Sequence, residues 1–393
     1  MKPKIWSAAL LVAGTAIGAG MLALPVVTAE GGFWPACFIY LLSWLFAAAT
    51  GLLLLEACLW LPKDANIISL ASHLLGLKGK IASWALYLFL FYCLMVAYAV
   101  GGGGFITSLT KDAISAPIGI LLFVLIFSPF VYAGTRAVDR LNFILMTGLV
   151  VSFVIFVLIS SGHVELSRFP RTHWSAALFA LPVIFTSFSY QGTVPSLVSY
   201  FQQKAQPLRK VIIIGSLIPL FVYVIWELLI LGIVPLEGAG GLLEAKVQGD
   251  SAVMPLKGVI GSPYIYALGQ AFAFFALTTS FLGVALGLMD FLADGLKLRK
   301  EGKNRAVLYA CVFLPPAIIA MLKPTIFLRA LGYAGGIGCA LLLGLIPVLM
   351  VWSGRYRKKL AFQPQLPGGK ASLLLLVLFI AIELVYEFMN EIH

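Results

Sequence analysis

The chain has 393 residues, of which 61% are hydrophobic and only 11% are charged. A soluble globular domain carries about a quarter charged residues, so the composition excludes an ordinary soluble protein and predicts one that lies in a membrane. The formal net charge of +11 comes from Lys and Arg spread among short loops, which argues against the basic face of a nucleic-acid-binding protein. The 5 cysteines lie singly in apolar stretches, without a CxxC pair, so neither a disulfide nor a metal site is expected.

Apolar stretches of about 18 residues or more recur along the chain, and each is long enough to cross a bilayer as a helix. The first is too long for the apolar part of a signal peptide and lacks a clean A-x-A cleavage site, so we expect it to remain. The predicted fold class is an all-α polytopic membrane protein, one transmembrane domain over 1–393 with about eleven transmembrane helices. The spans are expected near 5–28, 33–61, 82–109, 117–134, 141–161, 175–200, 208–234, 263–292, 306–322, 330–352 and 371–390.

The distribution of basic residues predicts how these spans are oriented. With a cytoplasmic N-terminus, 20 of the 27 Lys and Arg residues lie in loops on the inside and 7 lie outside. This bias is the one that the positive-inside rule describes. An odd number of spans then places the C-terminus, with His393, on the outer face.

The first span contains an unusual run, "GTAIGAGMLALP" at 14–25. Gly14, Gly18 and Gly20 lower the steric cost of leaving helical geometry, and a non-helical backbone at membrane depth must be buried in protein or line a wet cavity. The alternative is close helix packing, since Gly14 and Gly18 form a GxxxG pair.

The sixth span repeats the anomaly with "FTSFSYQGTVPS" at 185–196. Glycine packing alone does not need the glutamine in this run. Interrupted spans five apart are typical of transporters built from two inverted halves, whose substrate site lies between the breaks. We expect a first repeat over about 5–161, a second over about 175–352, and an extra helix at about 371–390.

Two broken helices suit an amino acid as substrate. The positive N-terminal end of a half-helix attracts a carboxylate, while unwound carbonyls attract an ammonium or a cation. The expected binding groups are the backbone around Thr15, Ala16, Gly18, Ala19 and Gly20, facing Ser187, Phe188 and Ser189.

Three aromatic residues flank the second break and offer stacking partners to an aromatic substrate, namely Phe185, Phe188 and Tyr190. Gln191 carries two donors and one acceptor. It either reaches a phenolic hydroxyl of the substrate or stabilises the unwound backbone.

Acidic residues inside the spans are candidates for ion coupling, because an ionised carboxylate in a membrane must be paired, neutral or in a wet cavity. Glu56 lies late in the second span and Glu227 late in the seventh, and both are candidate proton carriers. Glu383 lies outside the expected ten-helix repeat.

The two runs quoted above, with "TTSFLGVALGLMDFLADGL" at 278–296, resemble the hydroxy and aromatic amino acid permeases of bacteria, within the amino acid/polyamine/organocation superfamily. The similarity covers nearly the whole chain and is greatest to tyrosine-specific permeases. It implies a leucine-transporter-like fold, proton-coupled uptake and a place in the inner membrane. In that membrane, the orientation predicted from the basic residues makes the C-terminus periplasmic. No cofactor is expected.

The same resemblance raises the question of sodium. In sodium-coupled relatives of this fold, hydroxyl groups of the eighth span join carbonyls of the first span around the ion, and here Thr279 and Ser280 stand in that span. The alternative is that each hydroxyl bonds to its own helix.

The function predicted is secondary active transport of an aromatic amino acid, most simply L-tyrosine, by proton symport. A sodium-coupled or tryptophan-preferring permease of the same fold, and an amino acid receptor that does not transport, stay open as alternatives. A channel would need a continuous polar pore, and the sequence offers no constellation for an enzyme. No obligate protein partner is inferred.

Overall fold

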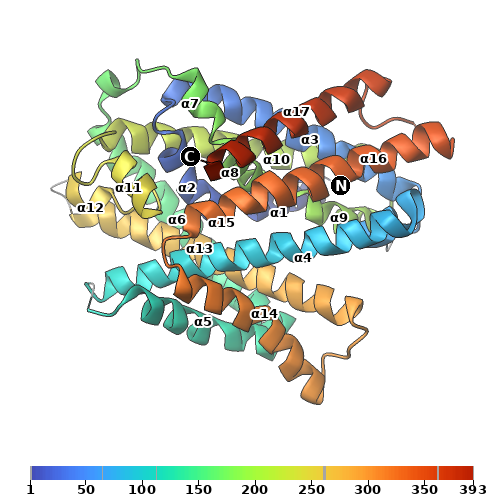
Figure 1. Ribbon diagram of the computed structural model, residues 1–393, viewed down its shortest axis with the longest axis horizontal. Coiled ribbons are helices and arrows are strands. Elements are labelled where there is room, and N and C mark those ends of the chain that lie inside the picture. Colours follow the sequence, from blue (N-terminus) through green and yellow to red (C-terminus); the bar gives the residue numbers. More distant parts are fainter. Residues whose placement is uncertain (1, 64, 112, 260–262, 361–362, 393) are drawn as a thin grey trace.

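The computed structural model describes residues 2–63, 65–111, 113–259, 263–360 and 363–392. His393, expected on the outer face, lies outside the described residues. Within these ranges every regular element is helical, and in Figure 1 the long helices run across the view with α5 and α14 along its lower edge. The chain is therefore an all-helical bundle, as predicted.

Nine of the described helices are long and apolar enough to cross a membrane, or ten if a bent pair counts as one. The bent pair consists of α1 (Lys2–Ala16) and α2 (Ala19–Thr28). The other long segments are α3 (Phe33–Leu59), α4 (Ile67–Leu109), α5 (Ala116–Ala133), α6 (Thr135–Ser160), α10 (Ala205–Ile233), α13 (Pro263–Gly295), α14 (Gly302–Leu322), the composite helix 327–357 and α17 (Gly369–Ile392).

The expected sixth span, 175–200, is divided into pieces, none of which is long enough to cross a membrane by itself. These pieces are α7 (Trp174–Leu178), α8 (Leu181–Ser187), the 3-10 turn η3 (Gln191–Thr193) and α9 (Val194–Tyr200). The composite helix at 327–357 consists of α15 (Phe327–Tyr333), the π-helix η4 (Ala334–Leu345), α16 (Ile346–Trp352) and the π-turn η5 (Ser353–Arg357). The order of elements thus matches the expected spans, while the boundaries of the two repeats stay a prediction.

A helical segment that was not predicted precedes the third span. The span was expected at 82–109, and α4 continues from 77 to 109 after a kink at Gly76, but it already begins at Ile67 before that kink. Asn66 caps this helix by accepting a hydrogen bond from the Ser69 amide at 2.8 Å, and the chain turns at Gly76, whose φ is 78°. A hydropathy window missed the first turns because they are amphipathic, with Ile67 and Leu70 buried and Ser69 less so.

The core lies around the two broken segments. All but one residue of α2 and the whole of α8 are buried, and α2 packs against α8 and α10. Large apolar side chains are exposed on the outer helices instead, for example Phe143 on α6 and Phe388 on α17. Large apolar side chains on the surface are typical of a protein whose outer surface meets lipid.

The long loop between α10 and α13 folds back on the core. It carries α11 (Leu242–Gln248) and α12 (Leu256–Val259), which lie together at the left end of the bundle in Figure 1. The Ala252 amide donates to the Leu22 carbonyl of α2 at 2.8 Å. The loop therefore lies against α2 at Leu22.

Candidate substrate-binding site

The first break separates α1 from α2, which are bent by 55°. Helical hydrogen bonding continues to Ile17, whose amide donates to Ala13. The backbone of Gly18 is extended, with φ −156° and ψ −149°. A side chain at Gly18 would collide with the Ser280 hydroxyl of α13, so the glycine lets these two segments touch.

The second break lies between α8 and η3, at Phe188, Ser189 and Tyr190. The Gln191 side chain stabilises the unwound backbone, because its carbonyl accepts from the Tyr190 amide at 2.9 Å. Its amide donates to Thr50 of α3 at 3.1 Å. In this structure Gln191 therefore takes the second of the two roles considered for it.

The two breaks meet at Gly20 and Ser187. A Cβ atom added to Gly20 would lie 2.5 Å from the Ser187 hydroxyl oxygen and 2.9 Å from Ser187 Cα. Contacts this short leave no room for a methyl group, so glycine is required here. The predicted pairing of the first and sixth spans is present.

A tyrosine that the sequence did not single out joins the two broken ends. Tyr223 of α10 is fully buried, and its hydroxyl lies 2.7 Å from the Ala16 carbonyl and 2.6 Å from the Ser187 carbonyl. These are the last carbonyls of α1 and α8. One hydroxyl proton thus serves two acceptors, at the negative ends of two half-helices.

Other predicted site residues lie beside the contact between Gly20 and Ser187 and do not form it. Phe185, Phe188 and Gln191 line a small enclosed cavity together with Ser43 and Cys339. Tyr190 is buried beside it and donates to the Ala47 carbonyl at 3.0 Å. Ala16 and Ala19 are buried at the first break.

Two of the predicted hydroxyls are turned back on their own segments. Thr15 is exposed and its hydroxyl donates to the Leu11 carbonyl at 2.8 Å. Ser189 is half-buried, and its hydroxyl donates to the Thr186 carbonyl at 2.6 Å. Neither side chain points at an open site in this conformation.

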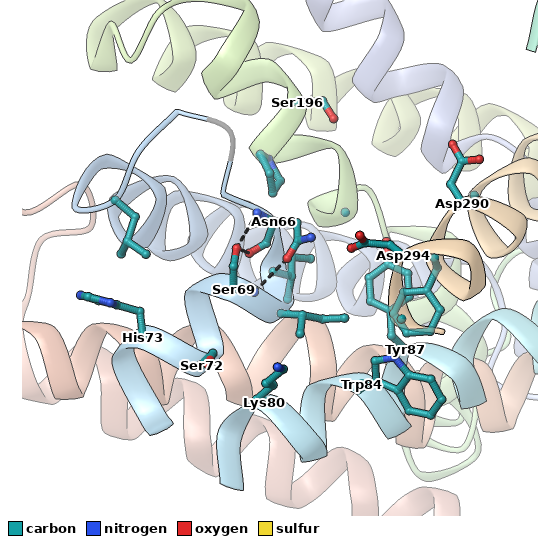
Figure 2. Close-up of a pocket in the computed structure, with 18 of the residues that line it drawn as sticks. Asn66, Ser69, Ser72, His73, Lys80, Trp84, Tyr87, Ser196, Asp290 and Asp294 are labelled. Carbon is teal, nitrogen blue, oxygen red and sulfur yellow. Dashed lines mark hydrogen bonds between the residues drawn. The ribbon is translucent and has the colours of Figure 1, made fainter. Parts of the chain in front are cut away.

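A much larger cavity of about 1050 Å³ reaches the second break from one side of the membrane domain. Gly192 and Pro195 of the broken segment line it, and Tyr87 and Phe291 form a stacked pair on its wall with centroids 4.7 Å apart. Figure 2 shows Asp294 near Tyr87, across the cavity from His73. The other labelled residues in this view are Asn66, Ser69, Ser72, Lys80, Trp84, Ser196 and Asp290.

The two candidate acids have different surroundings. Glu56 accepts from Arg355 Nε at 2.6 Å and Nη2 at 2.7 Å, and from the Gln365 amide at 2.7 Å. Glu227 is fully buried and accepts from the Thr28 hydroxyl at 2.5 Å and the Tyr40 hydroxyl at 2.6 Å. A cation therefore holds Glu56, while hydroxyl groups hold Glu227.

The candidate sodium ligands lie on α13. Thr279 donates within its own helix, to the Phe275 carbonyl at 2.9 Å and the Ala276 carbonyl at 3.0 Å. The Ser280 hydroxyl faces Gly18 at the first break. Within the described ranges no group of three or more His, Cys, Asp or Glu side chains is arranged to hold a metal ion.

An all-helical bundle with two apposed broken helices defines an integral-membrane transporter of the leucine-transporter fold. A solved structure with this fold, MhsT in complex with L-phenylalanine, superposes with a TM-score of 0.67 at 16% identity and covers 97% of both chains. Residues 1–386 match the tryptophan/tyrosine permease family, and the chain belongs to that family. The family and fold resemblance expected from the sequence are confirmed.

Curated relatives in bacteria are named as transporters. A tyrosine-specific transport system of Haemophilus influenzae is 33% identical, over 90% of this chain and 88% of that protein. A tryptophan-specific transport protein of the same organism is 32% identical over the same shares. A glutamine transporter of Aliivibrio fischeri is also 32% identical, over 96% of this chain and 98% of that protein. The chain is thus a multi-pass transport protein and not an enzyme.

Proposed function

We propose that this chain imports an aromatic amino acid, L-tyrosine first, across the bacterial inner membrane by proton symport with alternating access. The observation that carries the proposal is the contact between the two broken helices at Gly20 and Ser187. It brings the N-terminal end of α2 next to the C-terminal ends of α1 and α8. The partial positive charge at the start of α2 and the partial negative charges at the ends of α1 and α8 therefore face the same small region.

This region suits a zwitterion. The Ala19 and Gly20 amides at the start of α2 have no acceptor within the helix, so they can donate to a carboxylate, whereas the Met21 amide donates to the Gly18 carbonyl at 3.2 Å. The Ala16 and Ser187 carbonyls, now bonded to Tyr223, can accept from an ammonium group. In our proposal the substrate ammonium takes the place of the Tyr223 hydroxyl between these carbonyls.

The small cavity next to this region has aromatic walls, and at about 10 Å³ it takes a substrate side chain only when the segments around it move apart. It is walled by Phe185 and Phe188, which present ring faces and edges, and by the Gln191 amide. The buried Ser43 hydroxyl, which also lines the cavity, has no hydrogen-bond partner among the described residues, and a phenol hydroxyl can pair with it where a phenyl ring cannot. The tyrosine-specific relative supports tyrosine as the first substrate to test, and the tryptophan-specific and glutamine relatives define the alternatives.

Proton coupling is proposed to act through Glu227. Both carboxylate oxygens of Glu56 are engaged by the Arg355 guanidinium, so this side chain serves a fixed ion pair. Glu227 is held by hydroxyls of α2 and α3 instead, so adding or removing a proton changes contacts beside the first break. A sodium site around Thr279 and Ser280 is the alternative.

Alternating access is supported by the unequal closure of the two sides. The large cavity lies beside Lys80, Lys297 and Lys358, which the positive-inside rule assigns to the cytoplasm. The loop between α10 and α13 lies against α2, where its Ala252 amide donates to the Leu22 carbonyl. We propose that this conformation faces the cytoplasm.

The test is tyrosine uptake by purified protein in liposomes, with a proton gradient or a sodium gradient imposed separately. Proton-driven accumulation that tyrosine blocks better than tryptophan, phenylalanine or glutamine supports the proposal. Accumulation driven by sodium would identify sodium as the coupling ion. Stronger block by another amino acid would identify that amino acid as the preferred substrate. Specific binding without accumulation indicates a receptor.

A further inference from the structure

Three carboxylates form a row on the last helix, α17, that the proposed substrate site does not use. Glu383, Glu387 and Glu391 are spaced by four residues and so share one face of the helix. Their burial increases along the row: Glu391 is exposed, Glu387 is 6% exposed, and Glu383 is 0% exposed. The row therefore leads from the surface into the bundle.

Glu383 has no hydrogen-bond partner in the described part of the chain. Both of its carboxylate oxygens are buried and unpaired, although α17 packs against η4 and α8. An ionised carboxylate without a partner is strongly disfavoured in an apolar interior. A bound proton removes the charge and makes the group a neutral carboxylic acid.

The facing helix is shaped to receive the middle member of the row. A Cβ atom added to Gly336 of η4 would lie 2.6 Å from Glu387 Cγ, and one added to Gly332 would lie 3.5 Å from Glu387 Oε2. Glycine at these two positions gives the carboxylate room between the helices. The recess is thus a feature of η4 and α15 and not of α17 alone.

Few titratable or charged groups face this row from the packed helices. Cys339 of η4 lies within electrostatic range of Glu383, and Cys93 of α4 within range of Glu387. Tyr333 lies beside Glu391 and Glu387 at the surface end, with Arg329 next to it. Cys339 also lines the small cavity of the proposed substrate site, so the inner end of the row adjoins that site.

We propose that Glu383 and Glu387 form a proton-binding site, separate from Glu227, that exchanges protons with the solvent through Glu391. A hydronium ion at the Glu391 end gives up its proton and becomes water, and the receiving carboxylate becomes a carboxylic acid. The proton passes to Glu387 and then to Glu383 by the same exchange. The part of this inference that concerns transport rests on the proposed function, and it predicts that occupancy of this site shapes the pH dependence of uptake.

The first experiment reads the protonation state directly, without substrate. Infrared spectra of the protein in liposomes are recorded across a pH titration for wild type, Glu383→Gln, Glu387→Gln and Glu227→Gln. Asp139→Asn is the control, because Asp139 is exposed on α6. We expect Glu383→Gln to lose a carboxylic acid C=O band that the control and Glu227→Gln both keep. An unchanged band in Glu383→Gln and in Glu387→Gln overturns the proposal.

The second experiment connects the site to transport. Gradient-free exchange of tyrosine across the liposome membrane shows that each variant is folded and binds substrate. In exchange-competent variants, we expect Glu383→Gln to shift the pH profile of gradient-driven uptake and the control to leave it unchanged. If Glu383→Gln leaves the pH profile of uptake unshifted, the proton site has no role in transport. If wild type does not transport tyrosine, the proposed function fails while the infrared result still decides the proton site.

Discussion

Gly20 of α2 and Ser187 of α8 touch so closely that a methyl group on Gly20 would lie 2.9 Å from the Ser187 Cα atom. Residues 167 positions apart in the sequence thus hold the two broken helices together. Tyr223 bridges the same region, since its hydroxyl lies within hydrogen-bond distance of the last carbonyls of α1 and α8. The contact makes the two breaks one structural unit.

Gly20→Ala should therefore weaken substrate binding. Overpacking a tight contact costs about 1–3 kcal/mol, which corresponds to a loss of between about fivefold and about a hundredfold in affinity. Equilibrium binding of labelled tyrosine to detergent-purified protein measures it. Gly283→Ala is the matched control, because nothing lies within 4 Å of a Cβ added there. Equal affinities in the two variants would contradict the importance of the contact.

Tyr223→Phe should destabilise the protein without substrate and increase the stabilisation that substrate gives. Removing the hydroxyl leaves two buried carbonyls without their donor, at a cost of about 1–3 kcal/mol. A substrate ammonium would then restore the missing hydrogen bonds without displacing a hydroxyl. Thermal unfolding with and without tyrosine measures both effects, and Tyr264→Phe, at a side chain 73% exposed, is the control. If tyrosine raises the melting temperature of Tyr223→Phe by less than it raises that of wild type, the substrate ammonium does not bind between these two carbonyls.

Glu227→Gln should abolish accumulation and preserve exchange. Glutamine keeps the size of the side chain and one acceptor oxygen, and its NH2 group can donate to the hydroxyl that faced the other carboxylate oxygen, but it cannot take up and release a proton. We expect proton-driven uptake to stop at equilibrium with the outside, while gradient-free tyrosine exchange stays within about twofold of wild type. Continued accumulation in this variant would remove Glu227 as the carrier.

Glu56→Ala should act on stability instead of coupling. Arg355 would keep a nearly buried charge without its carboxylate partner, and breaking such a pair costs about 3–5 kcal/mol. Glu165→Ala is the matched control, since it removes an exposed partner from Arg168, where a surface pair is worth about 0–1 kcal/mol. Thermal unfolding of the two variants compares them. Equal melting temperatures would show that the Glu56 pair contributes little.

Asp250, in the loop between α11 and α12, should make stability depend on pH. Burial raises the pKa of Asp250 above its usual value, and the nearby Glu244 carboxylate adds to this effect. Because the folded protein favours the protonated form, this contribution to stability is present at low pH and is lost as the pH rises through the raised pKa. Asp250→Asn should therefore melt higher than wild type at neutral pH, with the difference vanishing near pH 3. Asp139→Asn, exposed on α6, should show no such gain.

Several features follow from the sequence because they depend on local composition. Apolar runs predict the spans, and the glycines and proline of 14–25 predict the first break, which the structure has at Ile17 and Gly18. The second break is equally local, since glycine, proline and polar residues crowd into 185–196. The start of α4 at Ile67 was missed because amphipathic turns lower the mean hydropathy of the window.

Tertiary structure alone decided which residues meet. Thr28 and Glu227 bond to each other 199 positions apart, and Arg355 reaches Glu56 across 299 positions. Hydropathy places each helix in the membrane, but it does not determine the rotation of a helix about its axis or its choice of neighbours. That is why Tyr223, an ordinary tyrosine in an apolar span, could be recognised only where α10 brings its hydroxyl between the ends of α1 and α8. The chemistry of the site comes from the residues, and its assembly comes from the packing of helices.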